Sequence, residues 1–153
     1  MDEARDILDY WFGAPGSPEY GALRPHWFRA GPEVDLEIRE RYQGQYRRAA
    51  AGGLDHWLDD PSQSLALVVV LDQFPRNMFR GQATSFAADA KALAVARHIL
   101  GRGYDRTYLA VQRVFAYLPF EHSENLSDQR LAVDLCAAIE GHPEKQKQVD
   151  FAK

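Results

Sequence analysis

The chain has 153 residues, 46% hydrophobic and 26% charged, which is the size and composition of a globular domain that needs no disulfide to fold. Its formal net charge of −4 excludes a general nucleic-acid binder, which would carry clustered lysines and arginines. The one cysteine, Cys136, excludes an intramolecular disulfide and is expected to be a small buried apolar residue rather than a nucleophile.

An amphipathic helix is predicted over residues 2–12. Asp2 can cap its start, its apolar residues follow helical spacing, and Gly13 ends it. The segment is acidic and has no basic region ahead of an apolar core, so it is not a signal peptide. No apolar run in the sequence reaches the roughly 18 residues that span a membrane. We therefore expect a cytoplasmic protein without membrane contacts.

A loop rich in glycine and proline is predicted over residues 14–31, followed by a helix from Pro32 to about residue 52. Proline is well suited to a first helical position. Within the loop, the aromatic residues of "HWF" at 26–28 are expected to pack as a plug against the core rather than stand in water. A short turn over residues 54–60 follows the helix.

The most apolar stretch, residues 62–74, is predicted to be a central helix. Periodicity alone does not separate a buried helix from a buried strand here. However, Ser62 after Pro61 is a typical helix start, and no partner strand is visible elsewhere in the sequence. A helix that is apolar on nearly every side must be covered by other helices. Because proline cannot continue a helix, Pro75 is expected to end this one near Phe74.

Two further helices are predicted next in the chain. The first covers residues 85–103, begins at a Ser85 cap and carries many alanines, which permit close approach to a neighbour. The second covers residues 105–119 and is closed by Pro119.

The last predicted helix with an apolar face opens at Ser127 and runs to Gly141, with Leu126 and Leu131 spaced for a hydrophobic staple. A mostly polar helix is expected over residues 143–153. The sequence thus predicts an all-α fold of six to seven helices, and their short links favour antiparallel pairs. We expect them to form a single domain over the whole chain.

Two polar clusters share one design, because each follows an apolar helix and surrounds a proline. The first cluster contains Asp72, Gln73, Arg76, Asn77 and Arg80, and the second contains Glu121, His122, Ser123, Glu124, Asp128 and Gln129. If the two helices are parallel neighbours, both clusters lie at the same end of the bundle.

The first cluster has two interpretations. In the structural one, Arg76 and Arg80 bond the last carbonyls of the apolar helix, and Asp72 pairs with Arg76. In the functional one, the arginines bind an anionic group such as a carboxylate or a phosphate, for which the guanidinium fork is suited.

The second cluster also has two interpretations. His122 is flanked by Glu121 and Glu124, which suggests acid–base chemistry. A metal site is disfavoured because no second histidine follows at helical spacing, and there is no glycine-rich phosphate loop, so we expect no cofactor. Alternatively, the loop only caps the following helix, and Glu121 meets an arginine such as Arg76 or Arg113.

The motifs "ILDYWFG", "HWF", "LDQFPRNMFRG", "FAADAKAL" and "YLPFEHSENLSDQ" together resemble the mostly bacterial domain-of-unknown-function family 924, over about residues 5–130. The resemblance implies a tetratricopeptide-like all-helical fold of antiparallel helix pairs layered in a right-handed superhelix, and no established activity. It maps the family's motif residues to Asp72, Gln73, Pro75, Arg76, Asn77, Glu121, His122, Ser123 and Glu124.

The chain departs from the family pattern at its C-terminal end. Relatives continue into a further helix with a second F-P-x-R-N-like stretch, whereas this sequence reaches Lys153 without one. We therefore expect that a C-terminal family segment is missing and that any site formed here lacks its contribution.

Three functional hypotheses follow. In the first, a binding module holds an anionic small molecule or a peptide carboxylate through Arg76, Asn77 and Arg80, and the ligand also meets Asp72, Gln73, Ser123 and Glu124. In the second, an enzyme uses His122 as general acid or base, Glu121 to orient it and Arg76 to stabilise negative charge. In the third, the motifs are structural parts of a protein-interaction scaffold.

Overall fold

The computed structural model describes residues 2–24, 27 and 31–139. In this part the fold is all-α, without strands, and has six helices when α3, η3 and α4 are counted as one continuous helix. The α-helices are α1 (Glu3–Phe12), α2 (Pro32–Ala50), α3 (Pro61–Val68), α4 (Phe74–Met78), α5 (Asp89–Arg102), α6 (Ala110–His122) and α7 (Leu126–Ala137). The segment η3 (Val69–Gln73) is a π-helical turn, and η2 (Asp55–Asp59), η4 (Ala83–Phe86) and η5 (Tyr104–Thr107) are 3-10 turns.

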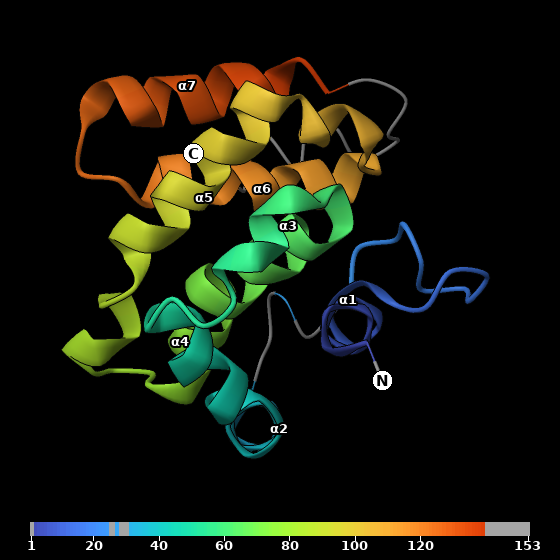
Figure 1. Cartoon of the computed structure of the whole chain (residues 1–153), viewed down its shortest axis with the longest axis vertical. Coiled ribbons are helices and arrows are strands. Elements are labelled where there is room, and N and C mark those ends of the chain that lie inside the picture. The colour runs from blue at the N-terminus through green and yellow to red at the C-terminus, as the bar shows by residue number, and fades with distance from the viewer. Residues whose placement is uncertain (1, 25–26, 28–30, 140–153) are drawn as a thin grey trace.

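The helix α3 lies in the middle of the molecule and touches α1, α5 and α6 (Figure 1). The helix α7 lies along α6, and α6 also packs against α5, so these three consecutive helices are neighbours. On the other side of the molecule, α2 packs against α4 and η3. No helix among the described residues is both long enough and apolar enough to cross a membrane.

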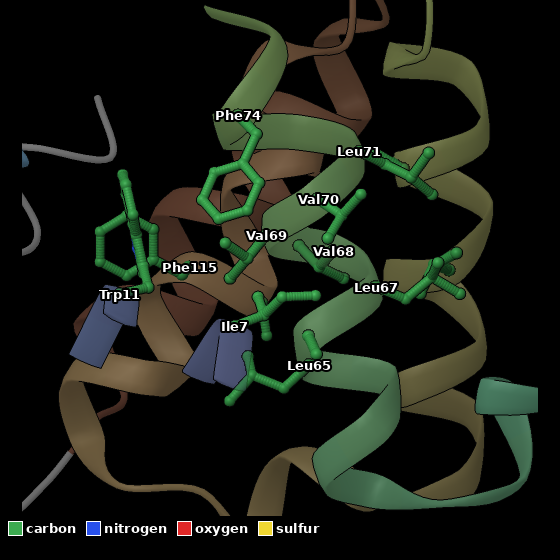
Figure 2. Packing of buried hydrophobic residues seen from close by; sticks show 14 of the residues in the cluster. Ile7, Trp11, Leu65, Leu67, Val68, Val69, Val70, Leu71, Phe74 and Phe115 are labelled. Atoms are coloured by element: carbon green, nitrogen blue, oxygen red, sulfur yellow. The ribbon is translucent and has the colours of Figure 1, made fainter. Parts of the chain in front are cut away.

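The predicted central helix is confirmed. Every side chain from Leu65 to Leu71 is at most 2% exposed, which requires neighbours on all sides. Figure 2 shows Leu67 on the side of α5, whereas Val69 points toward the aromatic residues of α1 and α6. The start differs by a residue from the prediction, because Asp60 caps the helix by accepting a hydrogen bond from Gln63 N at 2.9 Å, and Pro61 occupies the first turn.

The prediction that Pro75 ends this helix is wrong. The backbone widens into the π turn, in which Phe74 N–H bonds the carbonyl of Val69 five residues back, and then continues as α4. Pro75 falls in the first turn of α4, where its missing N–H group is tolerated. Asp72, Gln73, Arg76 and Asn77 therefore stand on a helix rather than on a loop, whereas Arg80 lies in the turn that follows α4.

Aromatic residues close the core between α1, α6 and the central helix. Trp11 packs edge-on against Phe115 with ring centroids 5.6 Å apart, and against Phe74 at 5.8 Å. The ring centroids of Trp27 and Phe115 lie 4.8 Å apart, which confirms for Trp27 the predicted packing of this segment against the core. Figure 2 shows Trp11 and Phe115 side by side. The other two residues of "HWF", 26 and 28, lie outside the described part.

Three predicted helix ends are corrected. Pro119 does not close its helix but lies inside α6, which continues to His122. Ser85 is not a cap, because it belongs to the turn η4 and donates to Gln82 O at 2.7 Å. Ser127 is not a cap either, since the Asn125 side chain accepts from Ser127 N at 2.9 Å.

The predicted staple does not form at the start of α7, because the side chain of Leu126 is 57% exposed. At the other end, α7 stops at Ala137, before the predicted end at Gly141, and the buried Ile139 follows it. The predicted polar helix over 143–153 lies outside the described residues.

The aromatic core generates a stability prediction. Trp11→Ala removes a side chain that is 1% exposed, and we expect the free energy of unfolding to fall by about 3–5 kcal/mol. Urea denaturation measures this change. The control is Leu36→Ala, which removes a side chain that is 56% exposed and should change stability by less than about 0.5 kcal/mol. A small effect of Trp11→Ala would contradict the proposed closure of the core by these rings.

Candidate functional site

The two polar clusters predicted from the sequence meet in space. His122, in the last turn of α6, lies beside the π turn η3, and its Nδ1 is 2.8 Å from Oδ1 of Asp72. The two residues are 50 positions apart in the sequence. The contact brings the π turn of the central helix and the last turn of α6 together.

The centre of this site is the carboxylate of Asp72, which is 0% exposed. Its Oδ2 accepts from Gln73 Nε2 at 2.7 Å, and its Oδ1 accepts from His122 Nδ1 and lies 3.5 Å from Nη1 of Arg76. A carboxylate only accepts, so Nδ1 of His122 carries the proton in this bond. When the ring is neutral, Nε2 is therefore left with a lone pair.

Arg76 contacts the same carboxylate and connects it to α5. Its Nη1 donates to the backbone carbonyl of Asp72 at 2.6 Å, which confirms the predicted role in bonding a carbonyl of the apolar helix. Its guanidinium also forms a bidentate pair with Asp89, at 2.9 and 3.0 Å. The ring of Phe86 lies 5.3 Å from Cζ of Arg76.

A pocket of about 350 Å³ opens beside His122. One wall is apolar and is formed by Phe86, Ala90, Leu93 and Pro119; the polar lining is formed by Asp89, His122, Ser123 and Glu124. Nε2 of His122 has no hydrogen-bond partner in the part of the chain that the structure describes, and it is not sealed from solvent. Arg76 is not among the described residues that line the pocket.

Asn77 and Arg80, from the same predicted cluster, serve a different contact. Asn77 Nδ2 donates to Asp35 of α2 at 2.9 Å, and Arg80 donates to both oxygens of Asp35 at 2.7 and 3.0 Å. These bonds join α4 to α2. Burial pulls the pKa of Asp35 upward, but the hydrogen bonds from Arg80 and Asn77 outweigh it and hold the pKa below the usual carboxyl value.

Glu121 is not the carboxylate that holds His122. It forms no ion pair with Arg76 or Arg113 among the described residues, and the histidine ring bonds Asp72 instead. Burial raises the pKa of Glu121, and the neighbouring His122 partly offsets this effect. Cys136 of α7 is 0% exposed, as predicted, and burial together with the charge of Glu121 raises the pKa of its thiol to about 12.

Ser123 helps to build the loop between α6 and α7. Its Oγ donates to Asp128 Oδ2 at 2.8 Å and accepts from the backbone of Asn125 at 3.1 Å, while Gln129 donates to its carbonyl at 2.7 Å. Hydrogen bonds from Ser123 and Arg97 hold the pKa of Asp128 below its usual value. The prediction that this loop caps the following helix is therefore confirmed for these residues, while Glu124 remains exposed at the pocket.

The sequence did not identify every residue of the site. Asp89 belongs to a separate predicted helix, and nothing in its position 13 residues after Arg76 predicts a bidentate pair. Nothing in the sequence separates Phe86 and Leu93, which line the pocket, from apolar residues that face the core. Among the described residues, no group of three or more His, Cys, Asp or Glu side chains is placed to hold a metal ion.

The comparisons with known proteins agree with the sequence motifs. A family model described as "Bacterial protein of unknown function (DUF924)" matches residues 7–153. The chain is also similar to a solved structure, that of the protein of unknown function ATU0120 from Agrobacterium tumefaciens, with 35% identity and a TM-score of 0.79; the match covers 97% of this chain and 81% of that one. Among curated proteins, none matches.

The buried carboxylate generates the second prediction. Asp72→Asn keeps the size of the side chain but removes the anionic acceptor of His122 and Arg76, so we expect the free energy of unfolding to fall by about 3 kcal/mol, measured by urea denaturation. Asp55→Asn is the matched control, because Asp55 is 54% exposed and its 2.9 Å pair with Lys91 is worth less than about 1 kcal/mol. Equal losses in both variants would show that burial gives Asp72 no special role.

The pairing of Asp35 generates a prediction about pH. Since its pKa in the folded state lies below the reference value of 3.8, the pairing stabilises the fold at neutral pH and is lost as the pH falls through the folded-state pKa. Asp35→Asn should therefore be less stable than the wild type at neutral pH, and the difference should shrink below pH 3.8. Urea denaturation across this range tests it, with Glu40→Gln, an exposed change on the same helix, as control. A difference that stays constant or grows on acidification contradicts the assignment.

Proposed function

The chain belongs to the DUF924 family of bacterial proteins of unknown function, and we propose that its pocket beside His122 binds a small organic molecule. One observation carries the proposal: a histidine whose Nδ1 is held by a buried carboxylate, and whose Nε2 has no partner among the described residues, lines a pocket of about 350 Å³. This volume is within the range of small-molecule sites. An apolar wall with a few polar groups is also typical of such sites.

A purely structural role explains this arrangement less well. Burying the carboxylate of Asp72 costs solvation free energy, which three donors offset. A histidine that served only as a donor to Asp72 would not need to line a pocket with an apolar wall. Here His122 lines the pocket, and its Nε2 is without a partner among the described residues.

The same pair supports acid–base catalysis as a second candidate function. A carboxylate that bonds Nδ1 selects one tautomer of the ring and stabilises the imidazolium formed when Nε2 takes a proton. In this reading His122 is the general base at Nε2, and Asp72, rather than Glu121, is the residue that positions it. Arg76, whose Nη1 lies 3.5 Å from the same carboxylate oxygen, balances the negative charge of Asp72.

An anionic ligand held by the arginines has less support. The guanidinium groups of Arg76 and Arg80 already form bidentate pairs with Asp89 and Asp35, and Asn77 shares the second pair. A peptide ligand would need an open groove with exposed apolar anchors. The pocket at His122 suits a small molecule better.

We also infer a tetratricopeptide-like superhelix in a single domain. The consecutive packing of α5, α6 and α7 supports it. So does the extension of one apolar cluster from α1 to Ile139.

The proposed binding is tested by ligand-observed NMR with a fluorinated fragment library. Ala90→Trp fills the pocket from α5, and Ala94→Trp is the matched control, because Ala94 is also exposed on α5 but is not among the residues that line the pocket. We expect fragments whose signals respond to the wild type and to Ala94→Trp but not to Ala90→Trp. A library without hits, or hits that Ala90→Trp leaves unchanged, would overturn the proposal.

A further inference from the structure

We propose that the ligand of this pocket is a small primary amine, bound as its ammonium ion through hydrogen bonds to acceptors, with an apolar body against Phe86, Leu93 and Pro119. This inference rests on the proposed function and adds the chemical class of the ligand. It follows from three properties of the lining: the kind of hydrogen-bonding groups that are free, the sign of the charge and the place of the apolar wall.

The lining presents hydrogen-bond acceptors. With Nδ1 of His122 committed to Asp72, the neutral ring presents the lone pair of Nε2. The hydroxyl of Ser123 uses its one donor in the hydrogen bond to Asp128. Asp89 and Glu124 contribute carboxylates, which in ionised form are acceptors only. No side chain among the described lining residues therefore has an unused donor, and a bound molecule must supply the donors itself.

The charges around the pocket are negative in sum. The carboxylates of Asp72, Asp89 and Glu124 outnumber the single guanidinium of Arg76, so the group carries net negative charge whether His122 is neutral or protonated. Charge inside a concave site is screened less than charge on an open surface. The negative charge of this pocket therefore attracts cations and repels anions.

The apolar wall lies next to these acceptors. Phe86 is 58% exposed although it belongs to the pocket, and its ring is already 5.3 Å from the guanidinium carbon of Arg76. An aromatic face attracts a cation near it, and the body of an amine would cover apolar surface that now faces water. A ligand with a charged end and a ring-sized apolar end matches the pocket of about 350 Å³.

The experiment compares three probes that share one ring and differ in the polar group: benzylamine, benzyl alcohol and benzoate. Isothermal titration calorimetry at neutral pH gives their dissociation constants for the wild type. We expect benzylamine to bind about tenfold more tightly than benzyl alcohol, and benzoate to bind most weakly. Glu124→Gln should weaken benzylamine about threefold to fivefold and leave benzyl alcohol unchanged.

Two controls locate the effect. Ala90→Trp should abolish binding of benzylamine, and Glu40→Gln, which removes an exposed carboxylate of α2 outside the pocket, should leave every dissociation constant unchanged. Circular dichroism melting curves confirm that each variant is folded before titration.

The outcomes separate the two proposals. If benzoate binds as tightly as benzylamine or more tightly, and Ala90→Trp abolishes both, the pocket binds small molecules but the amine inference is overturned. If none of the three probes binds, and the library contains no fragment whose binding Ala90→Trp abolishes, both proposals fail. If benzylamine binding is unchanged in Ala90→Trp, the amine binds elsewhere and the inference is overturned.

Discussion

The buried carboxylate of Asp72 is the constraint on which the rest of the site depends. An ionised group that is 0% exposed destabilises the fold unless donors replace the water it has lost. The donors come from three elements: the amide of Gln73 from the π turn, the guanidinium of Arg76 from α4 and the ring of His122 from α6. One charge therefore fixes the relative positions of two helices and the orientation of the histidine at the pocket.

The π turn explains how the chain can place these donors around one carboxylate. A turn with bonds to the fifth residue back is wider than an α-helical turn, and it lets the helix continue through Pro75. Arg76 then stands one turn beyond Asp72 and reaches both its carbonyl and its carboxylate. If the helix had ended at Phe74, Arg76 would belong to a loop, and its reach to Asp89 on α5 would not be fixed by helical geometry.

Sequence reasoning succeeded where local chemistry decides the structure. The central helix follows from its unbroken apolar run, and the pair of Asp72 and Arg76 follows from a spacing of four. It failed at Pro75 and Pro119 because proline ends helices on average, whereas here one lies in a first turn and the other inside a buried helix. It also missed the partners supplied by tertiary packing, among them Asp89, since no local rule links residues on separate helices.

The first polar motif is thus divided between two functions, although its residues are contiguous in sequence. Asp72 and Arg76 belong to the site, whereas Asn77 and Arg80 join α4 to Asp35 on α2. The contact with Asp35 supports the site around Asp72. Because α4 is short and begins directly at the π turn, its attachment to α2 limits how the turn can move. A motif that looks functional as a whole therefore contains one half that contacts His122 and one half that attaches α4 to α2. Their separation became visible only once the helix was known to continue past Pro75.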